Sequence, residues 1–117
     1  MLLAVDASTQ WIGLALYDGA QVISEFIWRT HNHHSVELSP AIDELLKRSE
    51  VKPADLLALA IALGPGSFTS LRIGLAVVKG ISYALRLPII GIPTLDILAA
   101  GIPVQPLEMA AVLQAGR

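Results

Sequence analysis

Residues 56–86 read LLALAIALGPGSFTSLRIGLAVVKGISYALR and carry the strongest fold signal in the chain. The apolar run over residues 56–63 shows no alternation, which is typical of a strand whose two faces are both covered. The Gly-Pro-Gly turn at residues 64–66 ends that strand, and Ser67 is a good N-cap for a long helix over residues 68–86. A buried strand followed at once by a helix predicts an α/β fold.

This long helix is apolar on more faces than packing against one sheet requires. Its charged residues, Arg72, Lys79 and Arg86, recur every seventh residue and form one narrow line. Gly74 and Gly80 each cost a helix roughly 1 kcal/mol relative to alanine, which favours close approach of another backbone there, either a partner or its own sheet. We therefore expect contacts on both sides of the helix, one of them with another protein chain.

Upstream, residues 1–30 alternate between apolar and polar positions as strands do. Breaks at residues 8–10 and 18–20 divide them into three strands, and the dipeptide Asp18-Gly19 favours a hairpin turn with positive φ. These strands are expected to form an antiparallel meander.

A helical period replaces this alternation from His34, and a helix is expected to about Glu50. Two starts fit the sequence. Ser35 could cap the helix, with Pro40 kinking its first turns, or Ser39 could cap it with Pro40 at the first helical position.

Downstream, residues 88–92 read as a last buried strand, and Thr94 caps a short helix that runs to Ala100. We expect a first lobe over residues 1–102, with a linker and the start of a truncated second lobe over residues 103–117. The order of elements predicts a mixed five-stranded sheet: an antiparallel three-stranded meander, parallel strands beside it, and covering helices.

Composition narrows the class of protein. The 117 residues include no cysteine and carry a formal charge of −2, so there is neither thiol chemistry nor a basic stripe for nucleic acid. Hydrophobic residues make up 54% and charged residues 15%, which is more apolar material than one small core needs. The uncharged run 56–71 is shorter than the roughly 18–20 apolar residues of a membrane span, and no basic region precedes the apolar N-terminus, so we expect a cytoplasmic protein without a membrane partner.

The first candidate site is the predicted turn between the first two strands. Asp6, Ser8 and Thr9 bring a carboxylate, two hydroxyls and turn amides, which can hold a phosphate with its magnesium ion. A plain hairpin is the alternative, because hydroxyl-rich turns are common.

The second candidate site is the turn formed by Gly64, Pro65, Gly66 and Ser67 before the long helix, where free amides and the helix dipole favour an anion. It lacks the Gly-Lys-Ser/Thr ending of a P-loop. The alternative is a tight structural turn with Ser67 as cap and Phe68 as a buried staple.

A metal or hydrolase site has weaker support. His31, His33 and His34 provide no i, i+4 helical pair, and only Glu37 is a nearby carboxylate, so a solvated loop is the favoured interpretation. Ser67 does not sit in a G-x-S-x-G elbow.

Three segments resemble the TsaB (YeaZ) family: residues 6–9 (DAST), residues 34–46 (HSVELSPAIDELL) and, most specifically, residues 64–74 (GPGSFTSLRIG). The likeness covers about residues 1–100. The family usually has threonine at position 7 and glycine at position 70, where this chain has alanine and serine, and its members are usually considerably longer.

The resemblance implies an actin-like, ribonuclease H-like (ASKHA) lobe. It implies a non-catalytic scaffold subunit that dimerises with TsaD and activates it in the threonylcarbamoyladenosine (t6A) modification of tRNA. TsaE joins that complex, tRNA is reached only through it, and the isolated subunit is a homodimer. No cofactor is required, and any ATP or ADP belongs to the full complex. The related catalytic subunit carries a His-x-x-x-His metal pair where this chain has Thr94 and Leu98.

The resemblance also places the dimer surface on the two long helices. The partner interface is then expected at Leu38, Ile42, Leu71, Arg72, Leu75, Val78, Lys79 and Ser82. Asp6, Ser8 and Thr9 become a vestigial nucleotide-phosphate site, and residues 64–67 a structural turn.

Two other functions stay open. In an actin-like ATPase or kinase lobe, Asp6 would position magnesium and a second lobe would supply the adenosine pocket. A glycoprotease-like metallopeptidase is motivated by the histidines and by older naming of such chains.

Overall fold

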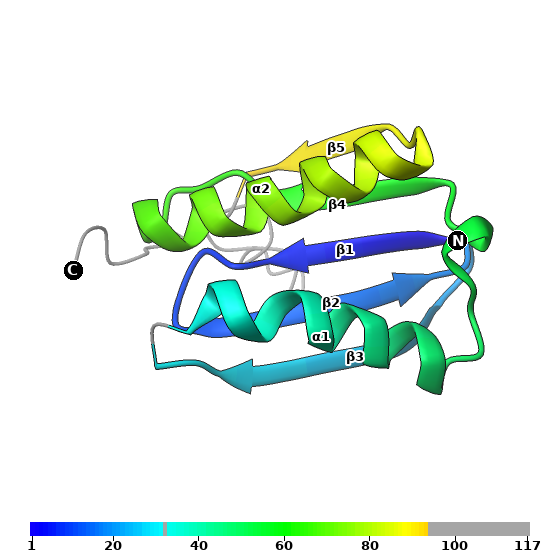
Figure 1. Ribbon diagram of the computed structural model, residues 1–117, viewed down its shortest axis with the longest axis horizontal. Coiled ribbons are helices and arrows are strands. Elements are labelled where there is room, and N and C mark those ends of the chain that lie inside the picture. The colour runs from blue at the N-terminus through cyan, green and yellow to red at the C-terminus, as the bar shows by residue number, and fades with distance from the viewer. Residues whose placement is uncertain (32, 94–117) are drawn as a thin grey trace, which may run out of the picture.

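A computed structural model describes residues 1–31 and 33–93, which form a sheet with helices on one side (Figure 1). The strands are β1 (Leu2–Asp6), β2 (Trp11–Tyr17), β3 (Val22–Arg29), β4 (Ala58–Ala62) and β5 (Ile89–Ile92). The helices are α1 (His34–Arg48), the short 3₁₀ turn η1 (Pro53–Asp55) and α2 (Phe68–Leu85). The helix predicted after Thr94 and the segment 103–117 lie outside the described residues, so the division into lobes stays a prediction.

The sheet has the predicted mixed topology, with the strand order β3-β2-β1-β4-β5. β1 and β3 both pair antiparallel with β2, whereas β4 pairs parallel with β1 and β5. The β2–β3 hairpin turns at Asp18-Gly19 as expected: Gly19 has φ +102°, and Asp18 Oδ1 accepts bonds from the amides of Ala20 and Gln21 at 2.8 Å. The antiparallel meander and the parallel extension are therefore both confirmed.

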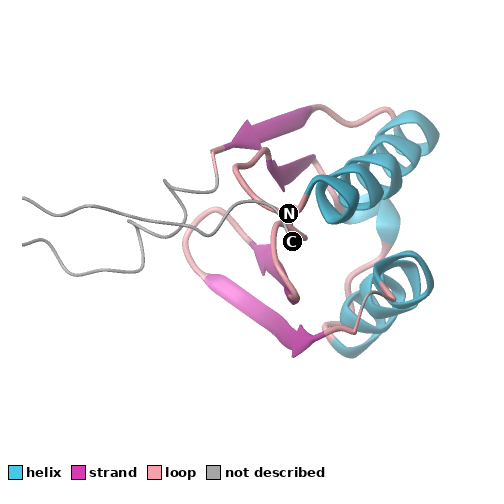
Figure 2. Ribbon diagram, turned by 90° about the vertical axis from the view of Figure 1, so that its left-hand side faces the viewer, coloured by secondary structure: helices cyan, strands magenta, loops and turns pink. Residues whose placement is uncertain are grey.

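The hydrophobic core lies between the sheet and the two long helices, which cover the same sheet face (Figure 2). Alternate residues of β1 and β2 point into it, as the period of two in a strand dictates. Its fully enclosed side chains include Leu3, Ile12, Leu14, Leu16, Leu38, Leu45, Leu59 and Val78.

The opposite face of the sheet is lined by small residues. Ala4, Ala15 and Ala60 lie side by side there on three neighbouring strands, with Ile27 and Ile92 at the margins. The short side chains leave a shallow hollow of about 260 Å³.

Helix α1 begins earlier than either predicted serine cap. His33 is the N-cap and makes no side-chain capping bond, and Ser35 and Pro40 lie inside the helix. The start is set instead by a contact that precedes the helix, since the amide of His33 donates to the hydroxyl of the buried Thr30 at 3.1 Å. Both predicted starts were wrong because this anchor depends on where β3 ends.

The predicted strand 56–63 is trimmed to Ala58–Ala62. Leu56 is buried but lies outside the strand, whereas Leu57 and Leu63 are exposed. The preceding turn η1 was not predicted; its Asp55 Oδ2 accepts a bond from the amide of Lys52 at 2.9 Å.

Helix α2 has the predicted start, with the Ser67 side chain capping it, and Arg86 ends it in the left-handed conformation. The two glycines of α2 differ in their surroundings. A Cβ at Gly74 would lie 3.0 Å from Ala7 Cβ, so the close approach there is to the chain's own sheet, whereas a Cβ at Gly80 would meet nothing within 4 Å.

By length and composition, α2 could cross a membrane. A helix that packs on the core of a water-soluble domain passes the same test, so this is weak support for a membrane role. Only 17% of the residues of α2 are buried. The feature that matters here is therefore its large apolar surface outside the core.

Candidate functional site

The two candidate loops lie against each other. The amide of Ser67 donates to the carbonyl oxygen of Ser8 at 2.8 Å. Gly66 lies so close to the same residue that a Cβ there would be 2.4 Å from Ser8 O and 2.8 Å from Ser8 Cβ. The end of β1 and the start of α2 therefore form one contact region, which the sequence indicated as two separate sites.

The polar groups of the β1–β2 turn are bonded within the turn. Asp6 Oδ1 accepts bonds from the amide of Ser8 at 3.0 Å and from its hydroxyl at 2.6 Å. Thr9 Oγ1 accepts from the amide of Trp11 at 3.0 Å, and Ser8 is only 2% exposed. In this conformation the Ser8 amide and hydroxyl point back to Asp6, so these two donors are used within the turn and are not available to a phosphate.

The turn before α2 is equally occupied by structural contacts. Ser67 Oγ accepts bonds from the amide of Ser70 at 3.5 Å and from its hydroxyl at 3.2 Å. The expected staple at Phe68 was wrong, because that side chain is 72% exposed and its ring lies 5.4 Å from the Arg72 guanidinium. Ser67 thus caps the helix, as predicted, but the residue after it faces outward.

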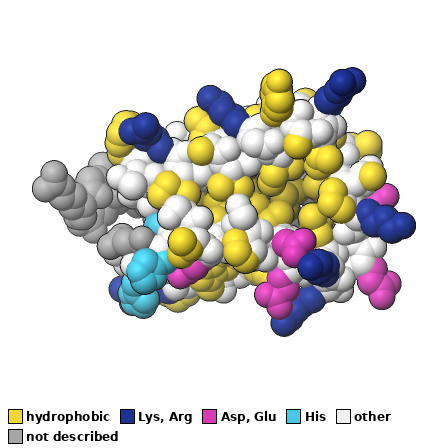
Figure 3. Space-filling model, in the orientation of Figure 1, with side chains coloured by type: hydrophobic (Ala, Val, Ile, Leu, Met, Phe, Trp, Pro, Cys, Tyr) yellow, Lys and Arg dark blue, Asp and Glu magenta, His cyan; other side chains and the backbone are white. Residues whose placement is uncertain are grey.

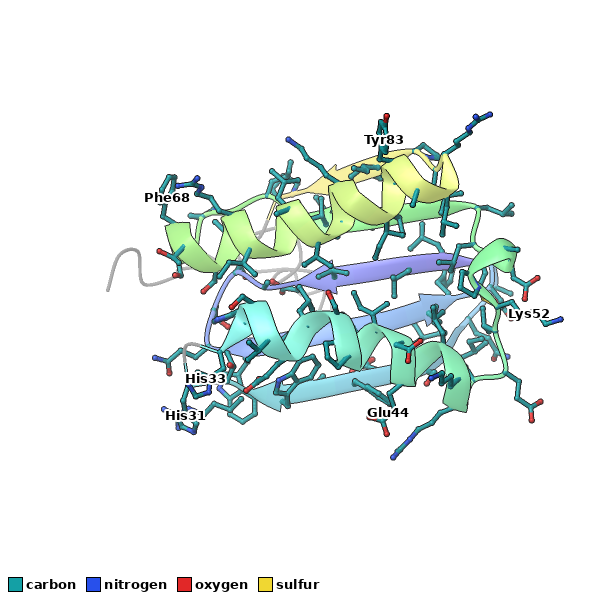
Figure 4. All side chains as sticks on the ribbon, in the orientation of Figure 1. His31, His33, Glu44, Lys52, Phe68 and Tyr83 are labelled. Carbon is teal, nitrogen blue, oxygen red and sulfur yellow. The ribbon has the colours of Figure 1, made fainter. Side chains whose placement is uncertain are left out.

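The three histidines have separate environments. His34 is buried, with Nε2 3.2 Å from the carbonyl oxygen of Thr9, while His31 and His33 lie at the exposed start of α1 (Figure 4). His33 Nδ1 is 3.9 Å from Glu37 Oε1. Within residues 1–31 and 33–93, no three histidine, aspartate or glutamate side chains are placed to share a metal ion.

Glu37 connects α1 to the sheet. The indole N–H of Trp28 donates to Glu37 Oε2 at 2.7 Å, and this bond is the main cause that lowers the pKa of the Glu37 carboxyl below its usual 4.5. The hydroxyl of Thr30 and the nearby His33 lower that pKa further.

An apolar groove of about 280 Å³ runs between the two helices. Hydrophobic side chains gather along it in the space-filling view (Figure 3). Ile42 and Leu46 of α1 and Ile81, Ala84 and Leu85 of α2 line it.

The expected partner-interface residues divide by burial. Leu38 and Val78 are fully enclosed in the core and present no surface, and Ile42, 5% exposed, lies at the floor of the groove. The prediction was wrong for Leu38 and Val78 because apolar residues on the inward face of an amphipathic helix belong to the lobe's own core.

The other predicted interface residues remain accessible. Leu71, Leu75 and Ser82 are half-buried, and Arg72 and Lys79 are exposed. Prediction from the sequence missed Ile81 and Leu85, although their i, i+4 spacing places them on one helix face.

Helix α2 also carries unbalanced charge. Residues 68–86 contain Arg72, Lys79 and Arg86 and no acidic residue. In the described parts of the chain, the ion pairs all lie on or beside α1, including Lys47 with Asp43 at 2.8 Å. Phe68 and Tyr83 project from the outer side of α2 (Figure 4).

Comparisons with known proteins agree with these features. Residues 21–117 match the sequence model of a family described as "TsaD: tRNA N6-adenosine threonylcarbamoyltransferase". The protein named tRNA threonylcarbamoyladenosine biosynthesis protein TsaB from Bacillus subtilis is 38% identical over 99 residues, which is 85% of this chain and 43% of that protein. The solved structure of YeaZ from Pseudomonas aeruginosa superimposes with a TM-score of 0.80 at 34% identity, over 84% of this chain and 46% of that one.

The chain belongs to the TsaB (YeaZ) family. It spans less than half the length of the TsaB proteins it matches. RuvC from Thermus thermophilus, with a TM-score of 0.53 at 14% identity, shares the fold alone. The expected actin-like, ribonuclease H-like (ASKHA) lobe is thereby confirmed for this TsaB-family chain.

Proposed function

We propose that this chain is the partner-binding lobe of a TsaB-type accessory subunit in tRNA t6A biosynthesis. In this role it dimerises with TsaD and activates it, and it performs no chemistry of its own. The observation that carries the proposal is the apolar groove between α1 and α2, together with the exposed apolar side chains on the outer side of α2. A helix with so much apolar surface outside the core favours a protein partner.

The shape of this surface suits another helix pair. Side chains at i and i+4 on α2, such as Ile81 and Leu85, form ridges beside the groove, into which ridges of a facing helix fit. Arg72 and Lys79 are exposed on α2 outside the groove, where they favour a partner with acidic residues. We propose the same surface for the homodimer, so that TsaD and a second copy compete for it.

A non-catalytic role is also favoured by the β1–β2 turn. Asp6, Ser8 and Thr9 are bonded within the turn, so the subunit itself requires no nucleotide, and ATP or ADP belongs to the full complex. We further propose that TsaE joins this complex, that tRNA is contacted only through it, and that the subunit works in the cytoplasm.

The test is the solution mass, by light scattering, of the full chain alone and mixed with TsaD of the same organism. Ala84→Glu places a charge at the exposed edge of the groove without removing a core side chain. Val22→Glu is the matched control, because it puts the same charge on a half-exposed residue of β3 away from the groove.

We expect a complex with TsaD for the wild-type chain and for Val22→Glu, and its loss for Ala84→Glu. An Ala84→Glu chain that still forms a complex with TsaD would contradict the proposed surface. A wild-type chain that stays monomeric and ignores TsaD would contradict the scaffold function.

A further inference from the structure

The turn between β1 and β2 touches the first residues of both long helices. On one side, the amide of Ser67 donates to the carbonyl of Ser8 at 2.8 Å, immediately before α2. On the other side, the ring of His34 in the first turn of α1 lies 3.2 Å from the carbonyl oxygen of Thr9. One short turn is thus the common anchor of the two helices that border the groove.

The contact with α2 is tight as well as hydrogen-bonded. Gly66, just before α2, packs on Ser8 with no room for a Cβ. Farther along the chain, inside α2, Gly74 packs on Ala7. Ala7, Ser8 and Gly74 are all buried. A shift of the turn would therefore move the first half of α2 with it.

The conformation of this turn depends on Asp6. Its Oδ1 accepts hydrogen bonds from both the amide and the hydroxyl of Ser8. One oxygen atom therefore fixes Ser8, and the carbonyl of Ser8 in turn accepts the bond from the Ser67 amide. A comparable acceptor lies at Asp18 in the β2–β3 hairpin, where Oδ1 accepts hydrogen bonds from the amides of Ala20 and Gln21, and these bonds connect the turn to neither helix start.

We infer that Asp6 is a positioning residue, not a magnesium ligand: its carboxylate oxygen holds the Ala7–Thr9 turn, whose contacts with His34 and Ser67 position the first residues of α1 and α2 against the sheet and so set the geometry of the groove. The importance of the groove for partner binding rests on the proposed function, but the anchoring itself does not. The actin-like fold implies a nucleotide phosphate at this turn. The hydrogen bonds from Ser8 to Asp6 argue against it, because they occupy the donors that a phosphate would need.

Two substitutions separate these roles. Asp6→Asn keeps an oxygen acceptor in nearly the same place but removes the negative charge that a magnesium ion requires. Asp6→Ala removes the acceptor. Asp18→Ala is the matched control, because it removes the equivalent acceptor from a turn that anchors no helix.

The measurement is hydrogen exchange of the Ser67 amide in the full chain, together with thermal unfolding, with and without Mg-ATP. We expect Asp6→Ala to speed exchange of this amide by about tenfold or more and Asp6→Asn to restore most of its protection. Asp18→Ala should leave exchange at Ser67 unchanged. If Asp6→Ala fails to fold, Ser8→Ala removes the 2.6 Å bond alone and should give a smaller change in the same direction.

Equal loss of protection in Asp6→Asn and Asp6→Ala would overturn the inference, as would unchanged exchange in Asp6→Ala. A thermal shift with Mg-ATP that wild type shows and Asp6→Asn lacks would assign the carboxylate to magnesium instead. Because exchange is measured without TsaD, the anchoring can be judged even if the light-scattering test rejects the scaffold function.

Discussion

The two long helices of this lobe differ in how much of their surface the lobe itself uses. Helix α1 buries His34, Leu38, Ile42, Leu45 and Leu46, and its exposed charges pair at i, i+4. Helix α2 is longer but buries only Ser70, Gly74 and Val78. Helix α1 therefore behaves as an ordinary surface helix, whereas α2 keeps apolar side chains outside the core, and we expect substitutions on the two helices to separate stability from association.

The largest effect should come from the core side of α1. Leu45 is fully enclosed, so Leu45→Ala should lower the free energy of unfolding by about 2–5 kcal/mol, measured by urea denaturation. Leu71→Ala on α2 is the comparison, and its half-buried side chain should cost clearly less. Equal losses on the two helices would remove the distinction between them.

The glycines of α2 should respond in opposite directions. Gly80→Ala should raise the free energy of unfolding by up to roughly 1 kcal/mol, because alanine is the better helix former and the site is open. Gly74→Ala should lower it, since its Cβ would press on Ala7, which directly follows β1. Thermal unfolding of the two variants measures both signs, and stabilisation by Gly74→Ala would contradict the close contact.

The outer side chains of α2 should matter little for stability. Phe68→Ser and Tyr83→Ser remove aromatic rings that are 72% and 91% exposed, so each should change the free energy of unfolding by about 0.5 kcal/mol or less. On the proposed function, the double variant should instead weaken association with TsaD, measured by light scattering. A large loss of stability would show that these rings already pack against other residues of the lobe, which would contradict their assignment to a partner surface.

The smallest effect concerns pH and α1. The bond from Trp28 lowers the pKa of Glu37 in the folded chain, so Glu37 adds stability above the unfolded value of 4.5 and loses that contribution as pH falls through the lower folded value. Thermal midpoints of wild type and Glu37→Gln should therefore converge as the solution is acidified below pH 4.5. Midpoints that differ by the same amount at every pH would contradict this account.

Much of the fold could be predicted from the sequence because its signals are local. The alternation in residues 1–30, the Asp18-Gly19 turn and the Ser67 cap each act within a few residues, and all three are present. The start of α1 could not be predicted, because it depends on the bond between His33 and Thr30, which lies at the end of β3.

The candidate site was harder to predict for the same reason. The residues Asp6, Ser8 and Ser67 were all singled out, but the bond from Ser67 to Ser8 joins segments far apart in the chain. The helical periodicity predicted which face of each helix is apolar. It could not separate the enclosed Leu38 and Val78 from Ile81 and Leu85, which line the groove. That separation depends on how the two helices are spaced on the sheet.

The central place of β1 has a consequence for synthesis on the ribosome. The antiparallel partner of β1, β2, follows it directly in the chain, but its parallel partner β4, with Leu59 opposite Leu3, is translated only after α1. Until that later strand emerges, the nascent hairpin exposes an unpaired strand edge and the apolar residues that α2 will cover. The sheet is complete only after β4 and β5 have been translated, so this lobe should depend on protection from aggregation during its own synthesis.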